Sequence, residues 1–204
     1  MPHVAESGRI AAPVDLELRA DAIRAFAAAA GADAAEYFDA ANPVVPPTFL
    51  SAERMPAGSL ETDHCFFTPP PRAGDRLTVV DGAERTVETA DGVARSESVT
   101  RYYDRTGRLI AESWASAPTD STVGEVDSAP AAARLAAYAT DWLGAGNVRR
   151  FRTRSVAAGE IAHCSGHIVQ QYVRDREPRV DVTLVGTDRD GAVVIRAWAT
   201  FAQP

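Results

Sequence analysis

Asp104-Arg105-Thr106-Gly107-Arg108-Leu109-Ile110-Ala111-Glu112-Ser113-Trp114-Ala115-Ser116 is the stretch that decides the fold, because the chain repeats it. The second copy reads Asp188-Arg189-Asp190-Gly191-Ala192-Val193-Val194-Ile195-Arg196-Ala197-Trp198-Ala199-Thr200. The Asp, Gly and Trp of the two copies are each offset by 84 positions. Upstream, Ala73-Gly74-Asp75 recurs as Ala158-Gly159-Glu160 at an offset of 85. Two matching blocks in the same order indicate that one structural unit occurs twice.

Each copy has the pattern of a β-hairpin. The aspartate starts a tight turn, and the glycine that follows supplies a positive φ. The segments on both sides of the turns, 98–103 and 109–114 in the first copy and 179–185 and 193–198 in the second, alternate polar and apolar residues or are β-branched. This pattern predicts an antiparallel meander in each half of the chain.

Helical patterns precede the meanders. Arg19–Ala30 and Pro130–Leu143 have apolar residues at helical spacing, and each is followed by a glycine. A further helix is predicted from Thr48 to about Met55, since Pro47 stands just before it. Residues 119–129 are poor in large apolar side chains and are interpreted as a linker. We therefore expect an N-terminal half over 1–118 and a shorter C-terminal half over 130–204.

The composition limits the class of function. The net charge is −7 and no basic stripe is present, so nucleic acid is not expected as a partner. No apolar run approaches the ~20 residues of a membrane span, and the first ten residues lack a signal pattern, so a cytoplasmic protein is expected. Neither the histidines nor the two cysteines complete a metal site, and no cofactor is expected.

A helix followed by an antiparallel meander, present twice, resembles a double hot-dog fold. This is an α+β architecture in which two helix-plus-antiparallel-meander halves form one sheet. His64-x-Phe66-x-x-Pro69-x-x-x-Ala73-Gly74-Asp75-x-Leu77 resembles the central strand and turn of MaoC-like dehydratases and hydratases, and residues 152–161 resemble the same element in the other half. Pro46-Pro47-Thr48-Phe49 resembles a stretch ahead of the central helix in that family. The resemblance implies an acyl thioester substrate, carried by coenzyme A or an acyl carrier protein, and leaves a homodimer open.

One departure from the family concerns its catalytic loop. MaoC-type hydratases carry Gly-Asp-x-Asn-Pro-x-His after a helix, and the Asp and His activate water. Here the loop from Gly31 to Asp39 contains Asp33 but no histidine, and the second half lacks the segment. Because an amine nucleophile needs less activation than water, conjugate (aza-Michael) addition of an amino acid is favoured. The outline is similar to dehydratase-like enzymes of β-amino-acid and macrolactam polyketide biosynthesis.

Candidate catalytic residues are His64, Thr68 and Tyr37. In an extended strand His64, Phe66 and Thr68 share one face, and a histidine beside a hydroxyl can move a proton near neutral pH. The alternative is a histidine satisfied within the core. Candidate substrate-binding residues are Asp33, Glu36, Phe66 and Thr48, although loop carboxylates such as Asp33 are more often simply solvated. Trp114 and Trp198 are expected in the core.

Three further functions stay open: an enoyl thioester hydratase or dehydratase, an acyl thioesterase that uses Glu36 or Glu53, and a non-catalytic acyl-binding partner subunit. In each case we expect a mostly apolar pocket between the two halves. The segment 19–42 should cover one side of it, because only one half contains that segment.

Overall fold

The structure, a computed structural model, describes residues 5–6, 12–52, 54, 56, 58–88, 93–119 and 127–203. It contains one antiparallel sheet and two α-helices. The strands are β1 (Ala5–Glu6), β2 (Val14–Glu17), β3 (Glu61–Phe66), β4 (Arg76–Asp81), β5 (Arg85–Glu88), β6 (Ala94–Tyr103), β7 (Leu109–Pro118), β8 (Val148–Ser155), β9 (His163–Arg174), β10 (Glu177–Thr187) and β11 (Val193–Ala202). The helices are α1 (Ala20–Ala29) and α2 (Ala129–Leu143), with short 3-10 turns η1 (Ala35–Tyr37) and η2 (Ala145–Asn147).

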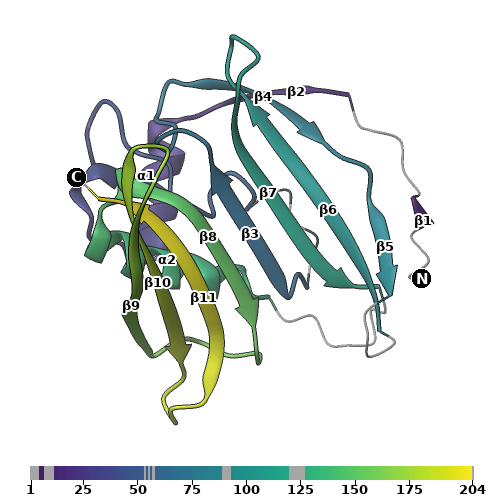
Figure 1. The fold of residues 1–204 in the computed structure, drawn as a ribbon, viewed down its shortest axis with the longest axis vertical. Helices are drawn as coiled ribbons and strands as arrows, with labels where there is room; N and C mark the ends of the chain where they lie inside the picture. Colours follow the sequence, from purple (N-terminus) through teal and green to yellow (C-terminus); the bar gives the residue numbers. More distant parts are fainter. Residues whose placement is uncertain are drawn as a thin grey trace.

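The two halves share the sheet through β3. The strand order is β1-β5-β6-β7-β3-β8-β11-β10-β9, with β4 paired to β6 and β2 paired to β4. On one side β3 pairs with β7 of the N-terminal half, and on the other with β8 of the C-terminal half. Figure 1 shows β3 and β8 running side by side at this junction. The prediction of two meanders in one continuous sheet is therefore confirmed.

The repeated phrase forms the same turn twice. Asp104 Oδ1 accepts hydrogen bonds from the backbone N–H groups of Thr106 and Arg108, at 2.8 and 3.0 Å. Asp188 Oδ1 does the same for Asp190 and Ala192, at 3.0 and 2.9 Å. The glycines that follow have φ values of +80° and +83°. The hairpins β6–β7 and β10–β11 thus use the turn chemistry that the sequence predicts.

Helix α2 fills the inner face of the C-terminal half. It lies against β8, β9, β10 and β11. Leu135, Ala136 and Ala139 are at most 1% exposed and belong to the main hydrophobic core. The predicted helix at Pro130–Leu143 is confirmed with one additional residue at its start, and that at Arg19–Ala30 is confirmed as α1.

The helix predicted from Thr48 to about Met55 is wrong over the residues of this range that the structure describes. Residues 47–52 form consecutive turns, in which the N–H groups of Phe49 and Ala52 bond to carbonyls three residues earlier. The Ser51 hydroxyl donates to Thr48 O at 3.2 Å, a local bond that competes with a helical ladder. A segment this short also cannot repay the cost of helix nucleation. Met55 and Glu53 lie outside the described residues.

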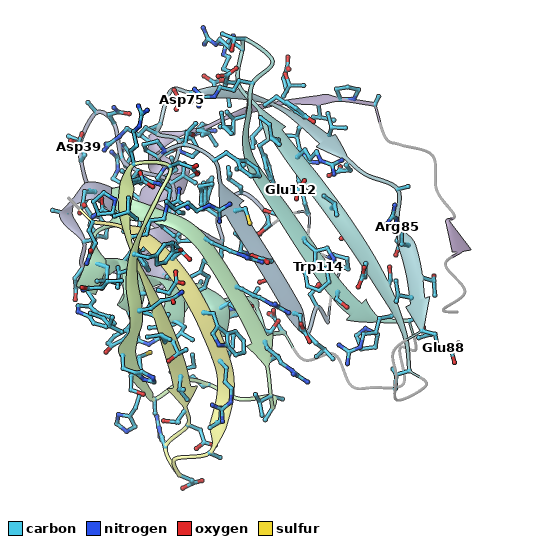
Figure 2. All side chains as sticks on the ribbon, in the orientation of Figure 1. Asp39, Asp75, Arg85, Glu88, Glu112 and Trp114 are labelled. Atoms are coloured by element: carbon cyan, nitrogen blue, oxygen red, sulfur yellow. The ribbon has the colours of Figure 1, made fainter. Side chains whose placement is uncertain are left out.

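The two faces of the sheet differ in character. On β3, Thr62, His64 and Phe66 point inward and are buried, while Glu61, Asp63 and Cys65 alternate with them. Trp114 pairs with Asp63 across β3–β7, and Trp198 pairs with Arg152 across β8–β11. Cross-strand partners share a face, so both tryptophans lie on the charged outer face, where Figure 2 shows Trp114 near Glu112.

The expectation that both tryptophans belong to the core is therefore wrong, since Trp198 is 42% exposed and Trp114 half-buried. Their position in the repeat fixes their place in the strand, but the face depends on the pairing register. Among the described residues, no helix is long and apolar enough to cross a membrane.

Candidate active site

A cavity of about 610 Å³ lies where the two halves meet. Four parts of the N-terminal half contribute to it: α1, the turn segment 47–52, the residues Pro56, Gly58 and Ser59, and strand β3. The first turn of α2 contributes from the C-terminal half. The walls are mainly alanine, proline and glycine, and the lining residues are Phe26, Ala29, Ala30, Thr48, Ala52, Pro56, Gly58, Ser59, Thr62, His64, Asp127, Ser128, Ala129, Pro130, Ala132 and Ala133. The expected apolar pocket between the halves, covered by the segment 19–42 on one side, is confirmed in this geometry.

His64 lies in the wall of the cavity and is 1% exposed. Burial lowers the pKa of its imidazole from 6.5 to about 4, and the neighbouring carboxylate of Asp63 opposes this shift only weakly. Because desolvation penalises the charged form, the ring is neutral at physiological pH. His64 is therefore unprotonated in the resting site.

The partners of His64 Nδ1 fix which nitrogen carries the proton. Nδ1 lies 3.0 Å from Ser113 Oγ and 3.4 Å from Ser51 Oγ. The Ser51 proton is directed to Thr48 O. The Ser51 oxygen is therefore free to accept, and we assign the proton of His64 to Nδ1 on this basis, with the Ser113 oxygen as its second acceptor.

Two buried polar atoms of the cavity wall have no hydrogen-bond partner among the described residues: His64 Nε2 and Thr48 Oγ1. Buried polar groups are nearly always paired, so each exception requires an explanation. With the proton on Nδ1, Nε2 presents a lone pair. The Thr48 hydroxyl can donate. The wall of an otherwise apolar cavity thus contains one acceptor and one donor that have no hydrogen-bond partner among the described residues.

Hydroxyl contacts hold the two halves together at this site. Thr62 Oγ1 and Thr153 Oγ1 lie 2.7 Å apart across the β3–β8 junction. Ser128 Oγ, just before α2, donates to Ser59 O at 2.6 Å. The exposed Asp127 stands at the rim and accepts a hydrogen bond from Ala129 N at 3.2 Å. The first two contacts attach β8 to β3, and the residue before α2 to the segment just before β3.

The structure does not bring Thr68 to His64. Strand β3 ends at Phe66, because three consecutive prolines follow from Pro69 and cannot donate to a ladder. Thr68 Oγ1 instead donates to Pro69 O at 3.0 Å. Thr62 occupies the neighbouring position on the face of His64. Phe66 shares that face as predicted, but it packs in the core at 4% exposure and does not line the cavity.

The loop residues proposed from the sequence also lie away from the cavity. Tyr37 is 1% exposed in a second core cluster, its hydroxyl has no partner among the described residues, and burial raises its pKa. Asp33 is exposed and Glu36 is half-buried. Asp141 of α2 accepts from the N–H groups of Asp33 and Ala34, at 2.9 and 2.7 Å, and so anchors the loop. Of the four residues expected to bind substrate, only Thr48 lines the cavity.

Sequence reasoning missed Ser51, Ser113 and Asp127. Ser113 had a detectable signal, because it stands in the repeated phrase on the strand that pairs with His64. Ser51 and Asp127 had none, since both lie in irregular segments whose path depends on tertiary contacts. No cluster of three or more His, Cys, Asp or Glu side chains suited to a metal ion occurs in the described part of the chain.

Comparison with known proteins gives matches only at the level of structure. No protein-family model and no curated protein sequence matches the chain. A solved structure described as a MaoC-like dehydratase superposes with a TM-score of 0.74 at 12% identity, covering 99% of this chain and 98% of the other. A MaoC-like dehydratase from Phytophthora capsici gives a TM-score of 0.64 at 11% identity, with 95% and 96% covered.

A third similar structure is a conserved hypothetical protein from Mycobacterium tuberculosis, described as having a double hot-dog fold. It gives a TM-score of 0.58 at 12% identity, covering 100% of this chain and 96% of the other. At these identities the likeness establishes the architecture and not the activity. The chain has the double hot-dog fold that the repeated hairpins predict.

Proposed function

We propose that this double hot-dog protein is a MaoC-like, dehydratase-like lyase that acts at the β-carbon of an α,β-unsaturated acyl thioester. The observation that carries the proposal is the pair of unpartnered atoms, His64 Nε2 and Thr48 Oγ1, in the wall of an apolar cavity. An acyl chain requires apolar walls with few polar groups. Addition to a conjugated thioester requires an acceptor for the nucleophile's proton and a donor for the thioester oxygen.

The two atoms can divide the reaction between them. As the nucleophile attacks the β-carbon, the electrons of the double bond move toward the thioester oxygen and form an enolate. The Thr48 hydroxyl is the donor available to this oxygen, and a positioned donor is most effective where charge develops. His64 Nε2 accepts the proton of the nucleophile, which then passes to the α-carbon. The net result is addition of one N–H or O–H bond across the double bond.

An amine nucleophile fits this site better than water. With a pKa of about 4, His64 is a weak base, and none of its described hydrogen-bond partners is a carboxylate. Water is a weak nucleophile and needs a strong base to activate it. A neutral amine attacks through its nitrogen lone pair and loses a proton afterwards. We therefore favour conjugate (aza-Michael) addition of an amino acid such as glycine. The product would serve as a β-amino-acid building block of polyketide biosynthesis.

Hydration or dehydration is the second candidate. Asp127 and His64 line the same cavity, so a carboxylate and a histidine are both present in its wall. Thioester hydrolysis has less support, because Glu36 is not among the lining residues and Glu53 lies outside the described residues. The remaining alternative is a non-catalytic acyl-binding subunit that partners an active hydratase.

One assay separates these functions. The purified protein is incubated with a crotonyl thioester alone and with added glycine, and the products are followed by mass spectrometry. We expect the glycine adduct at the β-carbon. A water adduct would indicate a hydratase and free acid a thioesterase. An unchanged substrate in every tube would contradict the enzymatic proposal and favour the binding subunit.

A further inference from the structure

The sheet ends on the side of the C-terminal half in a long strand that no other described strand covers. Strand β9 stands last in the strand order and pairs with β10 alone. Figure 1 shows β9 at one end of the sheet and β5 at the other. All twelve residues of β9 are exposed or half-buried. The backbone N–H and C=O groups that point away from β10 therefore lack a strand partner in the described part of the chain.

The opposite end of the sheet is covered by strands from the start of the chain. Strands β4 and β5 both pair with β6, and their other sides pair with β2 and β1. These two covering strands have only four and two residues, and β2 carries Asp15 and Glu17. Short length and charge are common ways in which proteins protect a sheet edge. Among the described strands β9 has no such cover, so the two ends of the sheet differ.

Strand β9 itself has few features that would prevent pairing at its edge. It contains no proline, and Arg174, at its last position, is its only residue with a formal charge at neutral pH. Asp175 Oδ2 lies 3.6 Å from Arg174 Nε and offsets this charge. A bulge at Val169 interrupts the register with β10, but the stretches 163–168 and 170–174 on either side pair regularly. The edge therefore keeps two regular stretches that can accept a further strand.

Apolar side chains gather on both faces of the sheet at this edge. Five of the ten large apolar side chains exposed on the described part of the chain lie here: Trp142, Ile168, Val169, Val173 and Trp198. On the inner face, Ile168 pairs with the buried Val182, and Trp142 of α2 covers Gly166, where a Cβ would stand 3.3 Å from Trp142 Cζ3. On the outer face, Val169 borders the same groove as Trp198. Such a concentration is typical of an interaction surface.

We propose that β9 pairs antiparallel with β9 of a second copy of this chain about a twofold axis, so that the two sheets join into one. A twofold axis sets a strand antiparallel to its own copy, and the backbone donors and acceptors of the two edges then match. The same axis brings the apolar side chains of the two edges together. It also places the two copies of Arg174 at opposite ends of the joined strands, where they do not repel each other.

The size of the surface sets the strength of the dimer. It comprises the twelve residues of β9 together with Trp142 and Trp198, which is fewer than the roughly 20–30 residues that each partner contributes to a standard interface. We therefore expect a reversible dimer with a dissociation constant on the order of micromolar. None of the described residues that line the active-site cavity belongs to β9, so the pairing does not involve the cavity wall.

Sedimentation equilibrium of the full chain, from about 1 to 100 µM, measures the dimer. Ile168→Lys/Val173→Lys places like charges along the joined edge and should raise the dissociation constant at least about tenfold. Both side chains are exposed, so the monomer should keep its fold. Val14→Lys/Val156→Lys adds the same charge at similarly exposed positions outside β9 and should dimerise like the wild type. A wild type that stays monomeric throughout, or a dimer that the β9 variant leaves intact, would overturn the proposal.

Hydrogen exchange locates the contact within the dimer. Above the dissociation constant, amide exchange over residues 163–174 should be slower than below it, because the N–H groups that point away from β10 then bond to the second copy. Residues 85–88 of β5, which β1 covers within the chain, should show no such dependence on concentration. Exchange over 163–174 that does not change with concentration would contradict strand pairing. Neither measurement requires turnover, so both outcomes are independent of the proposed reaction.

Discussion

The two halves build the same meander but fill its inner face in different ways. In the C-terminal half, α2 lies against four strands and buries eight of its residues. In the N-terminal half, the turn segment 47–52 stands where a helix was expected, and a cavity of about 610 Å³ adjoins it. The repeated hairpins therefore form a common scaffold, and the element placed inside each half decides whether the half is closely packed or borders a cavity.

The largest expected difference between the two halves comes from the buried His64 of the N-terminal half. It is measured as the pH dependence of the free energy of unfolding. His64 has a pKa of about 4 in the folded protein, below the 6.5 of an exposed imidazole. As the pH falls from 6.5 to 4, the unfolded chain binds a proton that the folded chain does not. The free energy of unfolding should therefore fall by roughly 3 kcal/mol across that window, and His64 should add no pH dependence above it.

Urea unfolding of the wild type and of His64→Gln, between pH 4.5 and 7.5, measures this effect. His64→Gln should lose most of the extra decrease at acidic pH. The exposed His163 of the C-terminal half supplies the control, and His163→Gln should retain the wild-type dependence. Parallel curves for all three proteins would show that His64 is not held neutral by burial.

The same substitution in the two helices should sharpen the contrast in packing. Ala136 of α2 is 1% exposed in the main core, whereas Ala29 of α1 is exposed and lines the cavity. Ala136→Phe should reduce the free energy of unfolding by about 1–3 kcal/mol, because it overfills a close-packed site. Ala29→Phe should change stability by less than about 0.5 kcal/mol and should reduce turnover by occupying the cavity. Equal losses of stability would contradict the difference between the halves.

The smallest expected difference in stability concerns the hydroxyl groups of two buried threonines, one in each half. Thr48 Oγ1 has no partner among the described residues, while Thr140 Oγ1 of α2 donates to Ala136 O and Ala137 O at 3.0 Å. Removing an unpaired buried hydroxyl relieves a desolvation penalty. Thr48→Val should therefore raise the free energy of unfolding by about 1 kcal/mol and lower kcat/KM at least about tenfold.

In the matched control, Thr140→Val should leave turnover unchanged, and Thr48→Ser should restore part of the lost activity by returning a donor. If Thr48→Val were as active as the wild type, the hydroxyl would have no role at the thioester oxygen.

The repeat in the sequence was sufficient to predict the sheet, because turn chemistry and two-residue alternation are local properties. Asp104 and Gly107 specify their hairpin without reference to the rest of the chain, and so do Asp188 and Gly191. The sheet face on which Trp114 and Trp198 lie could not be predicted from the local sequence, because it depends on which residues of β3 and β8 pair with them. The two hairpins therefore followed from the sequence, while the face of the two tryptophans did not.

The candidate site was predictable only in part. His64 and Thr48 could be selected from their motifs, but the path of the loop around Tyr37 depends on Asp141, 104 residues further along the chain. Thr68 was excluded by the end of β3, where the prolines stop the ladder. The serines that orient His64 come from separate segments and meet only in the folded protein.

Turnover of the His64 variants tests the central claim, that the cavity between the two halves is a site of chemistry on an acyl thioester. His64→Ala should lower the rate at least about a hundredfold, since positioned proton transfer is typically worth 10²–10⁴ in rate, while His163→Ala stays near the wild type. His64→Gln keeps bulk and a hydrogen bond, so it preserves the test if the alanine variant fails to fold. Near-normal turnover of a folded His64 variant would contradict the account and make His64 a residue of the core alone.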